Sequence, residues 1–270
     1  MIISRKKTNK IVILTGGSSG IGLATAQLFA SRDYFVFELS RRDINHQNAG
    51  IEHISCDVTN EEQVKTVVDD IFKQTNHIDV LISNAGYGIS GPIEFTSSVD
   101  AHNQFEVNFF GSLNVVKSVL PYMRKQGYGK IIFTSSVAAV LSIPYQAFYS
   151  ATKSAINSLA LALRNEVADF GIKVCAIMPG DVSTGFTDAR SKNSEGQQVY
   201  THTQKAIEAM EKDERGGMSA QYLARNIYRI VQKNNPAPLY TAGWQYKCFV
   251  VLEKLLPKRI SNWIVGLLYR

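Results

Sequence analysis

The fold of this chain is decided by one stretch near its start, KIVILTGGSSGIG, which occupies residues 10–22. Residues 10–15 are a short, β-branched apolar run that predicts a buried strand. Glycines and serines follow, and an apolar helical pattern then continues to about Arg32. Glycines between a strand and a helix allow a tight turn and let backbone N–H groups approach a pyrophosphate at the start of the helix. A simple turn is the alternative. The residues predicted to form the phosphate-binding loop are Gly16, Ser18, Ser19, Gly20, Ile21 and Gly22.

A second strand at residues 34–39 closes a β-α-β unit, so the residues after it are expected to reach the ribose of a bound nucleotide. These residues are Ser40, Arg41 and Arg42. An acidic residue at this place binds a ribose 2′-hydroxyl, whereas an arginine pairs its planar fork with a 2′-phosphate. Glu38 lies inside the strand, too early for the first role. The sequence therefore favours NADP(H) over NAD as the cofactor, with a solvated basic turn as the alternative interpretation.

Two further strands end in residues that suit a cofactor cleft. Residues 51–55 lead to Asp57, at a strand end where open parallel sheets bind ligands. Asp57 could accept a hydrogen bond from an adenine amino group, or it could cap the following helix, a role for which Thr59 and Asn60 compete. The strand at residues 80–83 ends in small residues that permit a cofactor to come close, namely Asn84, Ala85 and Gly86.

Strands and helices alternate from Ile11 to Met178, which predicts an α/β fold with a doubly wound, Rossmann-type parallel sheet. The later members of this series are helices at residues 100–120 and 147–163 and strands at residues 130–134 and 173–178. No internal repeat interrupts it, so residues 1–270 are expected to form a single domain. Its parts are a cofactor-binding and catalytic core (10–184), a polar substrate flap (185–217) and a helical C-terminal extension (244–270).

Two residues of the predicted helix at 100–120 and its end stand out, Asn108 and Pro121. Asn108 lies in its interior, where asparagine is a poor helix former, which calls for a functional role or a hydrogen-bonded structural one. Pro121 follows its apolar stretch and marks its expected end.

Tyr149 and Lys153 share one apolar helical run at residues 147–163. Residues four apart lie on one helix face, so the ammonium projects beside the phenol. A tyrosine ordinarily titrates near ~10, and a neighbouring positive charge is expected to lower its pKa and make it a usable acid or base. The pair can also arise by chance, as in many helices. Ser135 and Ser136 end the preceding strand, where a hydroxyl could hold a substrate oxygen against the tyrosine.

Composition and charge narrow the function classes. The 270 residues are 45% hydrophobic with a net charge of +6, which is compatible with an anionic ligand but too weak and dispersed to indicate nucleic-acid binding. Three cysteines without metal-ligand spacing indicate a reducing, cytoplasmic setting, and the five histidines show no metal-ligand pattern, so no metal site is expected. Residues 1–10 lack the apolar core of a signal peptide, and no run approaches the ~20 apolar residues of a spanning helix.

Taken in order, the motifs resemble those of the short-chain dehydrogenase/reductases over residues 10–184. They are Thr15-Gly16-x-x-x-Gly20-x-Gly22, Asn84-Ala85-Gly86, Asn108, Ser136, Tyr149-x-x-x-Lys153 and Pro179-Gly180. The resemblance implies that Tyr149 is the general acid/base, that Ser136 orients the substrate oxygen and that Asn108 holds a water of the proton relay. It also implies that Lys153 binds the nicotinamide ribose and lowers the pKa of the tyrosine.

The same resemblance assigns the remaining cofactor contacts and the mode of association. Val182 and Thr184 are implied at the nicotinamide carboxamide, Asp57 and Val58 at the adenine, and Ser40, Arg41 and Arg42 at the 2′-phosphate. Ser83 and Ala139 depart from the residues usual in the family, without touching the chemistry. Ser19 stands where many NADP-dependent relatives carry a basic residue, so the choice of cofactor rests on the two arginines. Relatives commonly form homo-oligomers through the helices beside the active site.

Two amphipathic segments, residues 244–256 and 260–269, end the chain on either side of Pro257. Apolar residues at helical spacing in the second are surrounded by lysine and arginine. A hydrophobic lid or a peripheral membrane anchor is one interpretation, and packing on the same domain or on a sister subunit is the other. The extension resembles that of the hydroxysteroid and retinol dehydrogenase-like members, which handle bulky apolar substrates.

These observations predict an NADP(H)-dependent oxidoreductase that transfers a hydride between the nicotinamide and a hydrophobic ketone or secondary alcohol. Reduction is the favoured direction with NADPH. A dinucleotide-binding sensor or scaffold without turnover is the alternative, which an intact Ser136, Tyr149 and Lys153 disfavour because a pure binder has little use for an activated phenol. A membrane-associated lipid-metabolising reductase is a third hypothesis, which differs in partner rather than in chemistry.

Overall fold

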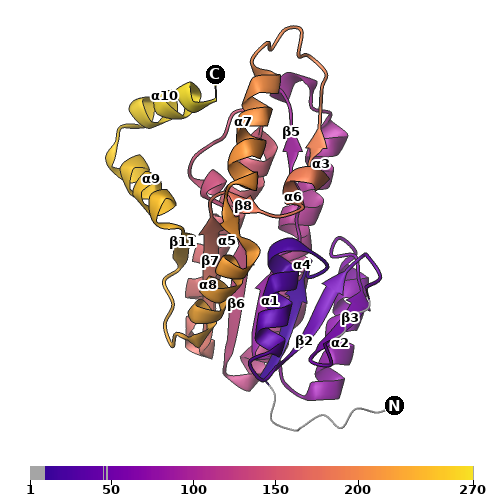
Figure 1. The fold of residues 1–270 in the computed structure, drawn as a ribbon. Helices are drawn as coiled ribbons and strands as arrows, with labels where there is room; N and C mark the ends of the chain where they lie inside the picture. Colours follow the sequence, from indigo (N-terminus) through magenta and orange to yellow (C-terminus); the bar gives the residue numbers. More distant parts are fainter. Residues whose placement is uncertain (1–9, 45, 47, 270) are drawn as a thin grey trace.

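A computed structural model describes residues 10–44, 46 and 48–269 of the chain. The expectations for residues 1–9 lie outside this part. Seven parallel strands form the central sheet in the spatial order β3-β2-β1-β4-β6-β7-β11 (Figure 1). They are β1 (Lys10–Thr15), β2 (Tyr34–Ser40), β3 (Ile51–Ser55), β4 (Val80–Ser83), β6 (Gly129–Thr134), β7 (Ile172–Pro179) and β11 (Leu239–Ala242). The predicted doubly wound parallel sheet is confirmed.

Strand β1 shows why these apolar runs become strands buried on both faces. Successive side chains of a strand point to opposite faces of the sheet. Ile11 and Ile13 accordingly pack into one core cluster, and Val12 and Leu14 into another. A parallel sheet must be covered on both faces, so a continuous apolar run rather than an alternating one is its pattern.

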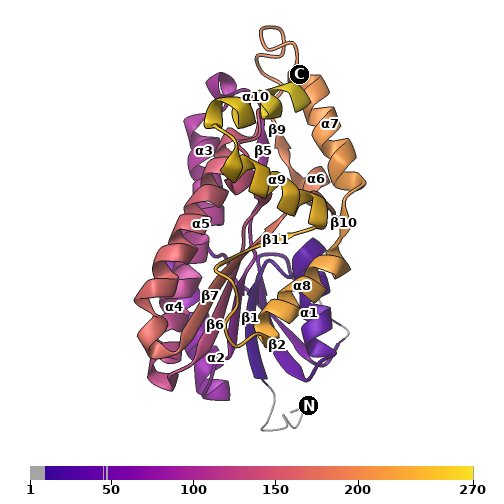
Figure 2. The ribbon, with the colours of Figure 1, turned by 90° about the vertical axis from the view of Figure 1, so that its left-hand side faces the viewer.

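Helices cover both faces of the sheet (Figure 2). The larger core lies under α2 (Glu61–Thr75), α4 (Gly111–Gln126) and α5 (Ala147–Glu166). The opposite core lies under α1 (Gly20–Ala30) and α8 (Ala220–Gln232), which pack against each other as well. The chain runs from β1 outward to β3 and then returns to the other side of β1 through β4. This reversal places a topological switch point between β1 and β4, where open α/β sheets bind their ligands.

The helix predicted at residues 100–120 differs from the observed structure. It consists of α3 (Ser98–Phe105), a π-helical turn at Glu106–Phe110 and α4, which continues through Pro121 to Gln126. The predicted end at the proline is therefore wrong. A proline has no N–H to donate to the carbonyl four residues earlier. For Pro121 that carbonyl belongs to Lys117. Both residues are exposed, so water can take the place of the lost hydrogen bond.

The part of the chain after β7 forms short ladders and the last helices. Two-stranded ladders join β5 (Ile89–Ser90) to β9 (Ser191–Lys192) and β8 (Val182–Ser183) to β10 (Met218–Ser219). The flap contains α6 (Phe186–Ala189) and α7 (Thr203–Arg215), and the extension forms α9 (Trp244–Leu255) and α10 (Lys258–Leu268). Among the described residues, no helix combines the length and apolarity needed to cross a bilayer.

Candidate active site

One cleft runs along the carboxyl ends of six sheet strands, β1, β2, β3, β4, β6 and β7. It contains every residue predicted for the site except Gly22 and Asn108, which stand directly behind its wall. In chain order, the predicted residues that line it are Gly16, Ser18, Ser19, Gly20, Ile21, Ser40, Arg41, Arg42, Asp57, Val58, Asn84, Ala85, Gly86, Ser136, Tyr149, Lys153, Pro179, Gly180, Val182 and Thr184.

The loop after β1 requires glycine at two positions for reasons of space. Gly16 has φ +68°, and a Cβ there would lie 2.8 Å from the Cα of Ala85. A Cβ at Gly22 would lie 2.1 Å from the carbonyl oxygen of Gly16. The absence of side chains therefore lets the start of α1 pack directly on the turn, with its N-terminal N–H groups at the cleft, where they suit an anion.

Asn84 and Thr15 fasten this turn to the neighbouring strand. The Asn84 side chain donates to the Gly16 carbonyl at 3.1 Å, and the Thr15 hydroxyl accepts from the backbone N–H groups of Asn84 and Ala85 at 3.0 and 3.1 Å. The sequence predicted only small residues at this place. Asn84 in fact holds the loop in shape, which positions the phosphate cradle across the β1–β4 switch point.

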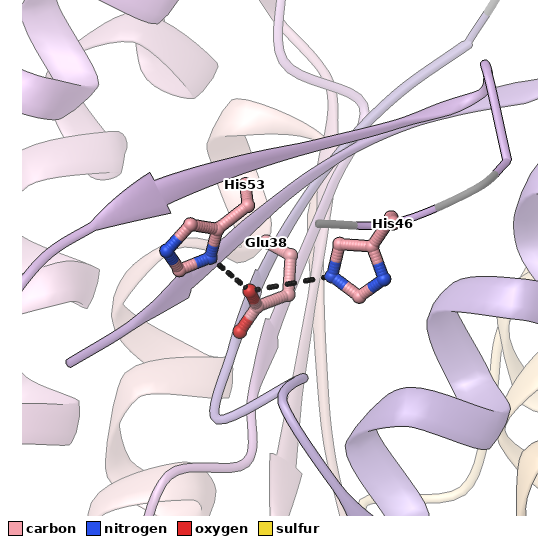
Figure 3. Close-up of side chains that lie close together, drawn as sticks. All are labelled: Glu38, His46 and His53. Carbon is pink, nitrogen blue, oxygen red and sulfur yellow. Dashed lines mark hydrogen bonds and ion pairs between the residues drawn. The ribbon is translucent and has the colours of Figure 1, made fainter. Parts of the chain in front are cut away.

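Glu38 supports the same loop, and Figure 3 shows it with the two histidines beside its carboxylate, His46 and His53. Its carboxylate is fully buried and accepts from the backbone N–H of Gly17 at 2.8 Å. The second carboxylate oxygen lies 2.6 Å from His53 Nδ1 and 3.6 Å from His46 Nε2. A Cβ at Gly17 would lie 2.3 Å from Glu38 Cγ, so the loop rests directly on this side chain. Glu38 thus has a role behind the cleft that its position inside β2 did not reveal.

The spacing of the histidines did not predict that His46 and His53 converge on Glu38. The three ligand atoms lie within 4.8 Å of one another, a spread that could hold a metal ion. Two atoms that bind one zinc ion at ~2.0–2.1 Å in a tetrahedral arrangement are about 3.3 Å apart. The 2.6 Å between His53 Nδ1 and the carboxylate is instead a hydrogen-bond distance. We therefore interpret the cluster as a hydrogen-bonded anchor of the glycine loop.

Replacing Glu38 with alanine is expected to lower the free energy of unfolding by about 2–4 kcal/mol, because it leaves the buried Gly17 N–H and the partly buried His53 without their acceptor. Glu38→Gln keeps one acceptor oxygen and should lose less. Chemical denaturation measures both, with exposed Glu62→Ala as the control. An equal, small loss in Glu38→Ala and Glu62→Ala would contradict the anchoring role.

Arg41 and Arg42 follow β2 on the exposed rim of the cleft, as predicted. Asp57 borders the cleft, and one of its carboxylate oxygens accepts from the N–H and the hydroxyl of Thr59 at 3.0 and 2.9 Å. The cap of α2 is Asn60, which accepts from the N–H of Gln63. The alternative between cap and cleft residue is thus resolved: Asp57 shapes the turn at the cleft, and Asn60 caps the helix.

Tyr149 lies at the other end of the cleft, on the first turn of α5. Burial raises the pKa of its phenol to about 12, while a hydrogen bond from Ser136 acts in the opposite direction. The nearby carboxylate of Glu214 raises the pKa further. The sequence-based expectation of a lowered pKa is therefore wrong, because the loss of hydration outweighs the favourable contacts. At neutral pH the phenol is protonated, which is the form that donates a proton.

Lys153 is buried one turn along α5, and its ammonium donates to the carbonyl of Thr134 at 2.8 Å. It lies 5.6 Å from the centre of the Tyr149 ring. Burial lowers the pKa of Lys153 to about 8. The ammonium is thus held between the end of β6 and the tyrosine, close to Gly86, whose missing side chain leaves room beside it.

Asn108 sits in the π-helical turn, buried behind Gly86. Its side chain accepts from the N–H of Tyr87 and donates to the carbonyl of the same residue, both at 3.0 Å. It also donates to the Thr152 hydroxyl at 3.1 Å, next to Lys153. The hydrogen-bonded structural role is therefore observed: Asn108 joins the loop after β4 to α5 and so sets the distance between the two walls of the cleft.

The substrate end contains residues that the sequence did not single out. Apolar Val137, Ile143 and Phe186 line it, and two carboxylates, Asp181 and Glu214, lie there as well. Glu214 accepts from Thr187 at 2.6 Å and pairs with the buried Arg190. Asp181 accepts from the Tyr246 hydroxyl at 2.6 Å, and burial raises its pKa. Only the strand-end position of Asp181, directly after Pro179-Gly180, was a signal in the sequence.

Comparison with known proteins agrees with this geometry. The family model described as short chain dehydrogenase matches residues 10–195. A 3-ketodihydrosphingosine reductase of Bacteroides thetaiotaomicron is 40% identical over 231 residues, which cover 84% of this chain and 85% of the relative. The crystal structure of a short-chain dehydrogenase from Streptomyces avermitilis matches with a TM-score of 0.85 at 27% identity, covering 95% of this chain and 97% of that one. The structure of ElxO with NADP bound matches with a TM-score of 0.76 at 27% identity, covering 89% and 100%. The chain belongs to the short-chain dehydrogenase family.

Proposed function

We propose that this oxidoreductase reduces long-chain apolar ketones with NADPH. The observation that carries the proposal is the meeting of Tyr149, Ser136 and Lys153 beside an apolar pocket, in the same cleft as the glycine loop. The cleft suits a dinucleotide, because Gly16 and Gly20 line it without side chains and α1 begins at its edge. Bound NADPH supplies the hydride.

The residues of the chain perform the remaining chemistry. The Ser136 hydroxyl orients the ketone oxygen and stabilises its growing negative charge. The protonated Tyr149 phenol donates its proton to that oxygen, and the Lys153 ammonium stabilises the phenolate left behind. The apolar wall of Val137, Ile143 and Phe186 excludes water and holds an alkyl chain.

A preference for NADPH is supported by the two arginines on the rim of the cleft. We expect Arg41→Ala to raise the Kd of NADPH by about 10-fold or more and that of NADH by less than about 2-fold, since a guanidinium binds a phosphate through charge-assisted hydrogen bonds. Titration calorimetry with both nucleotides measures this, with exposed Arg225→Ala on α8 as the control. Equal weakening of both nucleotides would show that Arg41 does not contact the 2′-phosphate.

The relative from Bacteroides thetaiotaomicron suggests the substrate class. A 3-keto sphingoid base has a long alkyl chain and an amino group on the carbon next to the ketone. The apolar wall fits the chain. Asp181 fits the ammonium, since its carboxylate borders the cleft and acts on the pKa of the Tyr149 phenol. We therefore propose a long-chain 2-amino ketone as the substrate.

The substrate proposal makes Asp181 a specificity residue. We expect Asp181→Asn to lower kcat/KM for 3-ketodihydrosphingosine by about 10-fold or more and to leave that of the matched ketone without an amino group unchanged, because a charged hydrogen bond contributes about 1.5–3 kcal/mol. The asparagine retains an acceptor for the Tyr246 hydroxyl. Equal losses on both ketones would contradict an ammonium contact.

The whole proposal is tested by following NADPH oxidation with a panel of 3-ketodihydrosphingosine, steroid ketones, retinal and small ketones. Turnover confined to the long-chain ketones supports it. Tight NADPH binding without turnover of any of them would favour a sensor or scaffold instead.

A further inference from the structure

The last two helices present a broad apolar face to the outside. Of the eighteen exposed large hydrophobic side chains in the described chain, ten lie within α9 and α10. They are Trp244, Phe249, Val251, Leu252, Leu255, Ile260, Trp263, Ile264, Leu267 and Leu268. So dense a patch on the surface of a soluble domain marks a site of association.

Helix α10 turns its apolar face outward, whereas a helix that packs on a protein core turns its apolar face inward. At about 100° per residue, its five exposed apolar side chains fall within an arc of roughly 140°. An arc of this width normally faces the core of a protein. Here the buried residues are Ser261 and Val265, at one margin of the arc, and the arc itself is exposed.

Helix α9 is apolar on two sides. Tyr246 and Val250 pack inward against Val137 and Met178. On the outer side, Trp244 and Leu255 are 78% and 75% exposed. Packing on its own domain therefore accounts for one side only. Packing on the same domain is thus observed for the inner side of the extension, and the outer side is exposed.

The charges around this face select the partner. Among residues 244–269 the single acidic side chain is Glu253, which is buried and paired with Lys258. Lys247, Lys254 and Arg259 are exposed at the margins. An anionic phospholipid surface complements such a rim, and each basic residue near it adds to the attraction. A two-fold contact between two copies would instead place this basic rim against itself.

The apolar face adjoins the active-site cleft. A Cβ at Gly180 would lie 2.2 Å from the Tyr246 ring, so α9 rests on the loop that ends β7. Figure 2 shows α10 beyond α9, at the end of the molecule that also holds α7.

We propose that α9 and α10 dock the protein on the surface of an anionic phospholipid bilayer. The exposed apolar face enters the boundary between headgroups and acyl chains, with the basic residues at its rim among the lipid phosphates. The cleft then opens beside the lipid, where an apolar substrate partitions. This docking depends on the two helices alone and is independent of the proposed substrate.

The two tryptophans of the chain, Trp244 and Trp263, both lie on the proposed contact face and are 78% and 62% exposed. Intrinsic fluorescence therefore reports the contact without a label. Added to the full-length protein, vesicles of phosphatidylcholine with phosphatidylglycerol should shift the emission to the blue and carry the protein into the pellet. Pure phosphatidylcholine should bind it less, and salt should weaken the binding to the anionic vesicles.

The double variant Leu255→Ser with Leu267→Ser keeps both tryptophans and should bind anionic vesicles at least about 10-fold more weakly. Ile93→Ser with Val99→Ser, at comparably exposed sites elsewhere, is the matched control and should bind like the wild type. The proposal would be overturned if the protein bound neither kind of vesicle, or if it bound both kinds equally at every salt concentration. The proposal would also be overturned if sedimentation velocity showed a dimer that the Leu255 and Leu267 substitutions convert to a monomer, because the apolar face would then join two copies.

Discussion

Tyr149→Phe is expected to reduce ketones about 10²–10⁴-fold more slowly than the wild type, with a nearly unchanged Kd for NADPH. Phenylalanine keeps the ring, which lies 5.7 Å from that of Phe186, and so preserves the wall of the cleft. It removes the O–H that protonates the ketone oxygen. The Ser136 hydroxyl can still bind that oxygen. Single-turnover oxidation of NADPH by stopped flow measures the step directly.

A matched control for this substitution is Tyr128→Phe, which removes a hydroxyl from an exposed tyrosine far from the cleft. It should leave turnover unchanged. If Tyr149→Phe also turned over at the wild-type rate, the tyrosine would not be the acid. Loss of NADPH binding along with turnover would point instead to a collapsed cleft.

Lys153→Met is expected to lower kcat by about 10²-fold or more and to stabilise the protein measured without added nucleotide. Burial lowers the pKa of Lys153 from 10.5 to about 8. At neutral pH the buried charge therefore destabilises the folded protein by roughly 3 kcal/mol. The ammonium donates to the Thr134 carbonyl, and loss of that hydrogen bond offsets about 1 kcal/mol. Methionine fills similar space without a charge.

The pH dependence separates this charge effect from packing. Above about pH 8 the folded protein releases the proton of Lys153, whereas the unfolded chain retains it up to about 10.5. The unfolded state therefore binds more protons in this window, and the contribution of Lys153 to stability rises with pH. We expect the advantage of Lys153→Met over the wild type in chemical denaturation to be largest at pH 7 and to shrink toward pH 10. A difference that stays constant with pH would assign it to packing.

The sequence predicted the core of the fold well because its signals are local. Each of the first six sheet strands is an apolar run followed by small or polar residues, and those residues form the cleft. Strand β11 was missed, since LYTA is short, only partly buried and lies at the edge of the sheet. Helix α8 was not predicted, although its apolar residues recur at helical spacing.

The parts of the site that escaped prediction depend on contacts between distant segments. Glu38 accepts a hydrogen bond from the N–H of Gly17, 21 residues away in the sequence. Asn84 donates one to the carbonyl of Gly16, 68 residues away. No spacing rule connects them. The direction of the Tyr149 pKa shift was mispredicted for a related reason. One turn of helix places Lys153 beside Tyr149, but only the fold shows how much hydration the two residues lose.

Strand β1 lies inside the sheet, and of the seven sheet strands it comes first in the chain. Strand β1 is apolar along its length and bonds to β2 on one edge and to β4 on the other. On the ribosome, the partner for that second edge arrives only when residue 83 has emerged, 68 residues after β1 ends. At ordinary rates of translation this delay is on the order of 3–14 s. During that time an open apolar strand edge can pair with other chains, so the nascent protein is a natural client for chaperones that cover such edges.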